Sequence, residues 1–184
     1  MGYPFESALS ASLAKTAERG PSPLEEELVR LYDEFRSPLL RYLLSLRVAA
    51  PEGEEIVQEV FLLLFRHLRE GKPRSNLRGW IFRVGHNLGL KNRMQRMRES
   101  AELFEEQHTD PGLDPEEQAA GKQRQARLLS VMRALPEQDQ CCLSLRAEGL
   151  RYREIAEILG ISLGSVANSL ERSLARLGRA DGGD

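Results

Sequence analysis

Residues 152–170 read YREIAEILGISLGSVANSL, and this segment is the most informative about the fold. Ile155, Ala156 and Leu159 recur at helical spacing and are expected to form the inner face of a first helix. Gly160 permits the left-handed backbone that ends a helix, and Ser162 is a favourable N-cap for the next one. The predicted core stripe of that next helix is Val166, Leu170, Leu174 and Leu177. The pattern is typical of a helix-turn-helix, whose second helix enters the DNA major groove.

The outward face predicted for the second helix is polar and can bind DNA. Asn and Arg make paired hydrogen bonds to adenine and guanine edges, Ser reaches bases or phosphates, and arginines before the first helix can contact phosphates. Basic and acidic residues nearly balance over residues 127–177, so we expect this bundle alone to bind DNA weakly. A solvated polar face is the alternative. The candidate residues are Arg151, Arg153, Ser165, Asn168, Ser169, Arg172 and Arg176.

Charge is strongly segregated along the chain, although its 184 residues carry a formal net charge of only −2. Residues 66–98 hold ten basic residues and one acidic residue, whereas residues 99–120 hold eight acidic residues and no Lys or Arg. A basic block followed by an acidic block indicates a polyanion-binding surface beside a solvated linker. No apolar run is long enough to span a membrane. The adjacent Cys141 and Cys142 make neither a disulfide framework nor a four-ligand zinc site.

The N-terminal half contains three further helical patterns and no convincing strand alternation. Apolar residues recur at helical spacing from Leu24 to Leu46, where Pro38 can break or kink the helix. A second helix opens at Pro51, and a third runs from about Leu77 to Arg98. We therefore predict an all-α protein of two small helical bundles joined by an acidic flexible linker. The expected parts are a flexible tail at 1–23, a domain at 24–98, the linker at 99–121, a helix-turn-helix domain at 122–178 and a disordered tail at 179–184.

The third of these helices is expected to bind nucleic acid. Its cations can contact phosphates, Asn87 can read a base edge, and the apolar Leu90 and Met94 can contact exposed bases. Trp80 stands near the polar loop at 71–76, a position that suits an unstacked base, although an ordinary core position is equally compatible. The predicted outer face comprises Arg83, His86, Asn87, Leu90, Met94 and Arg98.

The second helix carries a surface of a different kind. Opposite its predicted core stripe lie Glu55, Gln58, Glu59 and Leu62. An acidic face with an exposed leucine suggests a protein partner that offers basic residues and an apolar socket. A solvated face is again the alternative.

These motifs, in this order, resemble those of the bacterial RNA polymerase sigma factors, in particular the small extracytoplasmic-function (ECF) group of the sigma-70 family. Residues 54–62, EEIVQEVFL, are similar to the family's acidic Asp-Leu-Val-Gln-Glu helix. Residues 80–87, WIFRVGHN, look like its Trp-Leu…Ile-Ala-Arg-Asn signature. Leu135-Pro136-Glu137 and the run from Glu154 to Val166 resemble its conserved region four. The resemblance covers about residues 24–98 and 128–177.

The resemblance implies a role for each surface. The helix bearing Glu55, Gln58, Glu59 and Leu62 would dock on core RNA polymerase, and the helix-turn-helix would read the promoter's −35 element as duplex. The first domain would recognise and melt the −10 element by capturing a flipped base. The residues implied there are Arg74, Asn76, Arg78, Trp80, Arg83, His86, Asn87, Lys91, Arg93 and Arg98. The chain would be cytoplasmic and would carry no catalysis, cofactor, metal, small-molecule substrate or membrane insertion.

The sequence also departs from the family pattern. Gln140 stands where Arg is common, Lys91 where Asp is usual, and residues 165–169, SVANS, where the family commonly has Thr-Val-Lys-Ser-Arg. We therefore expect −35 binding to be weak or of unusual specificity, with the basic helix supplying most of the electrostatic affinity. Converting Ala167 to Lys and Ser169 to Arg is expected to strengthen duplex binding and steepen its salt dependence.

Other functions remain open from the sequence. The chain could be a sigma-like regulator that binds polymerase or an anti-sigma factor with weak or no −35 reading, or a helix-turn-helix repressor that dimerises through its first bundle. An enzyme would rest on Cys141 and Cys142, which fit two small core residues better. The promoter, the inducing signal and the presence of an anti-sigma factor are not specified by the sequence.

Overall fold

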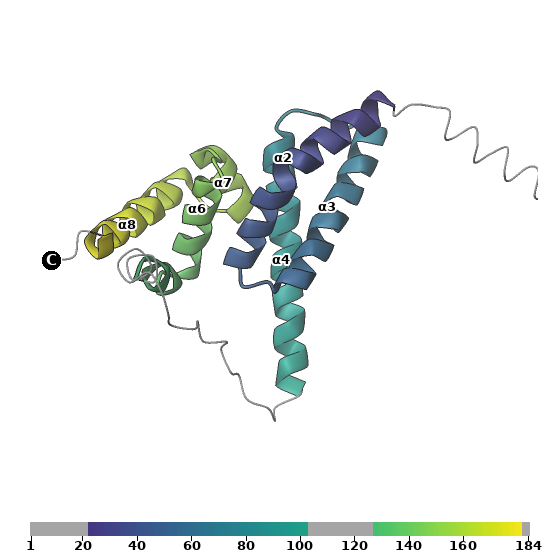
Figure 1. The fold of residues 1–184 in the computed structure, drawn as a ribbon. Coiled ribbons are helices and arrows are strands. Elements are labelled where there is room, and N and C mark those ends of the chain that lie inside the picture. The colour runs from purple at the N-terminus through teal and green to yellow at the C-terminus, as the bar shows by residue number, and fades with distance from the viewer. Residues whose placement is uncertain (1–21, 103–126, 182–184) are drawn as a thin grey trace, which may run out of the picture.

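The computed structural model describes residues 22–102 and 127–181, and every regular element in these ranges is a helix (Figure 1). The first unit comprises α2 (Pro23–Ser45), α3 (Ala50–Arg69) and α4 (Leu77–Glu102). The second unit comprises helical residues 127–133, α6 (Glu137–Ala147), α7 (Tyr152–Leu159) and α8 (Leu163–Asp181). The predicted all-α class is confirmed. Most of the expected N-terminal tail and of the expected linker lies outside the described residues. The expected disordered tail at 179–184 was wrong for residues 179–181, which belong to α8, and its other residues lie outside the described ranges.

Local signals set where the helices of the first unit begin. Ser22 forms a capping box with Glu25: the Ser22 amide donates to the Glu25 carboxylate at 2.7 Å, and the Glu25 amide donates to Ser22 Oγ at 3.3 Å. Asn76, with a φ of 59°, caps α4 by accepting from the Gly79 amide at 2.9 Å. Pro38 does not divide α2, because buried residues on both sides of it, among them Phe35 and Leu39, pack into the same core.

The helix-turn-helix forms as predicted, but the residues that α8 buries differ from the expected core stripe. Gly160 adopts the left-handed conformation with a φ of 66°, and Ser162 Oγ accepts from the Ser165 amide at 3.0 Å. Leu174 is 59% exposed, whereas Ser169 and Ser173 are fully buried. The helical period that places Val166 and Leu170 in the core next reaches residue 173 and not residue 174. The prediction that Leu174 continues the core was therefore wrong.

The two units share one hydrophobic core. Leu39, Tyr42 and Phe82 of the first unit belong to the same buried cluster as Cys141 and Leu145 of the second. Helix α2 packs on α6, and α4 packs on α7, while α3 lies on the side of the first unit that faces away from α6–α8 (Figure 1). Two bundles are predicted from the sequence, but the core that joins them is a finding of the structure. Within the described ranges, no helix is long and apolar enough to cross a lipid bilayer.

Candidate nucleic-acid and partner interfaces

One face of α4 presents cations to solvent. Arg83, Asn87 and Lys91 are exposed at intervals of four residues, and Arg98 is exposed two turns further on. A shallow groove runs along this face, with apolar contributions from Leu90 and Met94 between the polar side chains; it is lined by Asn87, Leu90, Lys91, Met94, Gln95 and Arg98. Cations beside apolar atoms can hold phosphates while bases pack against the methionine.

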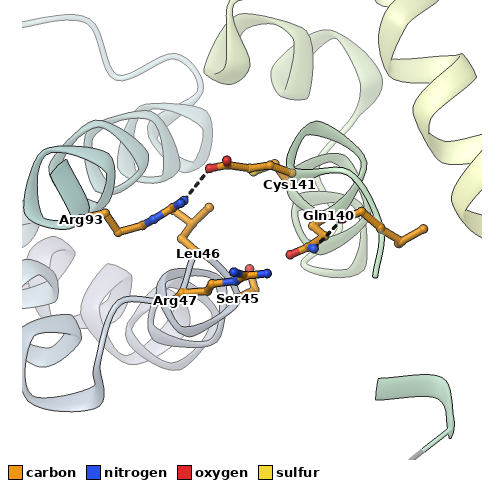
Figure 2. Close-up of a pocket in the computed structure, with 8 residues that line it drawn as sticks. Ser45, Leu46, Arg47, Arg93, Gln140 and Cys141 are labelled. Atoms are coloured by element: carbon orange, nitrogen blue, oxygen red, sulfur yellow. Dashed lines mark hydrogen bonds and ion pairs between the residues drawn. The ribbon is translucent and has the colours of Figure 1, made fainter. Parts of the chain in front are cut away.

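Three other predicted nucleic-acid residues of α4 face inward: Arg78 and Arg93 toward the second unit, and His86 toward α2. Arg78 donates to the backbone oxygen of Glu148, and Arg93 pairs with Glu137 at 2.5 Å (Figure 2). His86 is only 7% exposed, and its Nδ1 lies 2.7 Å from the Tyr42 hydroxyl. The expectation that His86 shares the exposed face of α4 was wrong, because its side of the helix packs against α2.

Trp80 and the loop before α4 lie at the N-terminal end of this helix. Trp80 is half-buried, and its ring centroid lies 5.0 Å from that of His67, whose Nε2 is 2.9 Å from the Pro73 carbonyl oxygen. Arg74 in this loop is exposed and pairs with Glu27 at 2.5 Å. Trp80 therefore combines a core contact with a partly open ring beside a polar loop. Asn76, also predicted here, uses its side chain to cap α4.

We expect the buried His86 to make the folded protein less stable in mild acid. Burial lowers the pKa of His86, although the charge of Glu137 works in the opposite direction. The unfolded chain therefore takes up the proton first, and stability falls as the pH drops below the ordinary histidine pKa of about 6.5. Urea unfolding at pH 7.5 and pH 5.5 should show this loss, and the loss should be smaller in His86→Gln. Equal losses in both proteins would contradict it.

The predicted partner surface on α3 is exposed and borders an apolar groove. Glu55, Gln58 and Glu59 are exposed on one face of α3, and Leu62 beside them is 62% exposed. Apolar side chains of α2, including the exposed Val29, form the other wall, which sequence reasoning missed; the groove is lined by Leu28, Val29, Tyr32, Gln58, Phe61, Leu62 and Phe65. The adjacent apolar pair at residues 28 and 29 is the signal that could have found it. This surface is an apolar groove with an exposed apolar side chain on each wall and an acidic border.

Internal contacts engage some of the side chains predicted to form the DNA-binding face of the second unit. Arg151, Arg153, Asn168 and Arg176 are exposed, and Ser165 is half-buried with its hydroxyl 2.9 Å from that of Ser162. Ser169, predicted to face outward, is instead buried, because this side of α8 packs on α6. Its Oγ accepts from the Gln138 side-chain amide at 3.1 Å.

Arg172 is the second predicted DNA contact that the structure uses internally. Its Nη2 donates to Asp139 Oδ1 at 2.8 Å, and its Nε donates to Oδ2 at 3.3 Å. Gln140, where the related family commonly has Arg, donates to the carbonyl oxygens of Leu135 at 2.7 Å and Arg133 at 3.1 Å. The cation missing at residue 140 is thus replaced by a side chain that fixes the turn before α6.

The two cysteines are buried thiols within the shared core. Burial, together with the nearby Glu137 and Cys142, raises the pKa of Cys141 to about 11, and burial also raises the pKa of Cys142. Both are therefore protonated at neutral pH, which disfavours a nucleophilic role. Across the described ranges, no three His, Cys, Asp or Glu side chains gather as metal ligands.

Comparison with known families gives two matches in chain order. Residues 31–99 match the model of sigma-70 region 2, and residues 125–177 match that of sigma-70 region 4. The chain is 30% identical over 168 residues to the ECF RNA polymerase sigma factor SigE of Mycolicibacterium smegmatis, covering 88% of this chain but only 63% of that relative. It is 28% identical over 161 residues to the ECF sigma factor SigL of Mycobacterium tuberculosis, covering 86% of this chain and 91% of SigL.

Two solved structures share the fold at 21% sequence identity. CnrH, in complex with the cytosolic domain of CnrY, matches with a TM-score of 0.57 over 82% of this chain and 84% of that chain. The sigma factor RpoE of Bartonella quintana, in complex with the anti-sigma factor NepR, matches with a TM-score of 0.59 over 84% of this chain and 98% of that chain.

Proposed function

The chain belongs to the ECF group of the sigma-70 family, and from that premise we propose that it binds core RNA polymerase and directs initiation at promoters. The observation that carries the proposal is the presence of two separate exposed surfaces on the first unit: the acid-bordered apolar groove of α2 and α3, and the cationic groove of α4. A protein that only bound DNA would need no such apolar groove. The polymerase would supply all catalysis, and the chain would work in the cytoplasm without a cofactor.

The groove of α2 and α3 is the proposed polymerase-binding surface. Val29 and Leu62 would enter an apolar site on the polymerase, while Glu55 and Glu59 would meet basic residues at its border. An anti-sigma factor is a further proposed partner, since the similar RpoE of Bartonella quintana was solved with one.

The exposed face of α4 is the proposed −10 reader. Arg83, Lys91 and Arg98 would contact phosphates, Asn87 would bond a base edge, and the half-buried Trp80 would stack on a base extruded from the duplex. Capturing an unstacked base stabilises the melted strand, so binding itself drives melting.

The second unit is the proposed −35 reader. Asn168 would contact a base edge in the major groove, and the exposed Arg151, Arg153 and Arg176 would contact phosphates. With Arg172 bound to Asp139, few cations remain for the duplex. We therefore infer that −35 contacts add little affinity and that α4 supplies most of it.

Leu62→Arg is expected to weaken binding to core polymerase by about tenfold or more, because it places a charge against an apolar site. The side chain is largely exposed, so the fold should tolerate the change. Fluorescence anisotropy with labelled protein would measure the affinity. The matched control is Asn87→Ala, which should lower promoter-dependent transcription and leave polymerase affinity unchanged. Full polymerase affinity in Leu62→Arg would contradict the assignment of the groove.

The whole function is tested by co-purification with core polymerase followed by sequencing of the bound DNA. We expect a shared promoter motif among the fragments, and transcription from that motif in a reconstituted reaction. Polymerase binding without transcription from any recovered fragment would overturn the proposal and favour a sigma-like regulator.

A further inference from the structure

We propose that this chain latches its two units together without a partner, and that the latch withholds part of the α4 face from DNA. The latch consists of Arg41, Arg78 and Arg93 on the first unit and of Glu137 and Glu148 on the second. Its existence is independent of the proposed function, whereas its inhibitory consequence rests on that function.

The centre of the latch is the short turn between α6 and α7. The Arg41 guanidinium donates two hydrogen bonds to the Glu148 carboxylate, at 2.9 Å from Nε and 2.7 Å from Nη2. The Glu148 side chain is only 12% exposed, so this two-point ion pair is shielded from solvent on the carboxylate side. Arg78 reaches the backbone oxygen of the same residue. Helices α2 and α4 of the first unit therefore both donate hydrogen bonds to Glu148 of the second.

Gly149 lets the turn approach α4 this closely. Its φ is 83°, a conformation that side chains rarely adopt, and a Cβ at this residue would lie 2.8 Å from a terminal nitrogen of Arg78. The left-handed backbone at Gly149 thus shapes the turn that the Arg78 side chain contacts.

The seam beside the latch is apolar and closed. Tyr42 of α2, Leu46 just after α2, and Cys141 of α6 are all buried in one cluster, and burial raises the pKa of Tyr42, with Cys141 acting in the same direction. A small polar cavity of about 100 Å³ marks the edge of this seam (Figure 2). Its walls come from both units, with Ser45 and Arg47 on one side and Gln140 and Cys141 on the other.

Closure removes cations from the proposed −10 surface. Arg78 and Arg93 are engaged with α6 and the turn after it, while Arg83, Asn87 and Lys91 stay exposed. Each phosphate contact that is lost lowers nucleic-acid affinity and its salt dependence.

The two cysteines provide a reporter of closure and its internal control. Cys141 lies on the face of α6 that packs against α2 across the seam. Cys142 is buried within the second unit, where burial raises its pKa although a hydrogen bond with Ser169 acts in the opposite direction. In a Cys142→Ser background, Arg41→Glu should speed maleimide alkylation of Cys141 about tenfold. In a Cys141→Ser background, alkylation of Cys142 should be unchanged. The charge swap Arg41→Glu with Glu148→Arg should return the Cys141 rate toward that of the parent protein.

Binding to fluorescent single-stranded and duplex oligonucleotides tests the inhibitory consequence. Arg41→Glu should bind several-fold more tightly than the parent, although the added negative charge opposes this, and the charge swap, whose net charge equals the parent's, should reverse the gain. Unchanged Cys141 alkylation in Arg41→Glu would overturn the latch, and faster alkylation without tighter binding would overturn its inhibitory role. A failure of polymerase binding would count against the proposed function alone, because alkylation needs neither polymerase nor DNA.

Discussion

Ser169→Arg is expected to destabilise the second unit strongly, not to strengthen its DNA binding. Ser169 is fully buried, and its hydroxyl lies within hydrogen-bonding distance of Gln138 and Arg172. An arginine there would bring a long charged side chain into a packed site beside Arg172, at a cost of roughly 3–5 kcal/mol. That is a large share of the roughly 5–15 kcal/mol that stabilises a typical domain. Urea unfolding followed by circular dichroism should show a large fall in the midpoint.

The neighbouring Asn168 provides the matched control. It is exposed on the face proposed to meet the duplex. Asn168→Lys should change the free energy of unfolding by no more than about 0.5 kcal/mol and steepen the salt dependence of duplex binding by about one phosphate contact. A Ser169→Arg protein with parental stability would contradict the burial of residue 169. It would restore the expectation, drawn from the sequence, that this residue faces DNA.

Most of the fold can be predicted from sequence signals that lie within a single helix or turn. Gly160 and Ser162 predict the turn of the helix-turn-helix, and the structure places both as expected. The sequence did not reveal the buried face of α8, because two of its core positions are serines. Ser169 and Ser173 are satisfied by hydrogen bonds, the first with α6 and the second with the backbone oxygen of Ser169. A hydrophobic pattern alone therefore favoured Leu174.

The candidate surfaces likewise contain residues whose exposure the sequence predicts and residues whose exposure it does not. Arg83, Asn87 and Lys91 on α4 were predictable, because their exposure depends on the period of a single helix. Arg78 and Arg172 were not, because each is bound by a residue remote in sequence, Glu148 for the first and Asp139 for the second. No periodicity within one helix identifies such a partner. Whether an arginine is free to bind DNA thus depends on how the whole chain packs, whereas helix formation depends on local sequence.

Asp139→Asn is expected to destabilise the folded protein by about 2–4 kcal/mol at neutral pH. Asp139 is 1% exposed and accepts both hydrogen bonds of the Arg172 fork. Asparagine keeps the shape but turns one acceptor into a donor that faces a guanidinium nitrogen, so a buried polar group loses its partner. The cost lies near the low end for a broken buried ion pair, because Arg172 itself is partly in solvent. Urea unfolding at pH 7 measures it, and Glu157→Gln, at an exposed acid on α7, should be nearly neutral.

The stability difference between the parent and Asp139→Asn should depend on pH, and this dependence distinguishes an effect of the Asp139 charge from an effect of its packing. Burial acts to raise the pKa of Asp139, but hydrogen bonds from Arg172 and Ser169, and the charges of Arg172 and Arg176, outweigh it and hold the pKa below its usual value. The carboxylate's contribution is therefore fully present above the unfolded pKa of about 3.9 and is lost as the pH falls through the lower folded pKa. The gap between the parent and Asp139→Asn should stay constant from pH 7 to pH 5 and narrow below about pH 4. A gap that persists unchanged at pH 3 would show that the asparagine acts through packing alone.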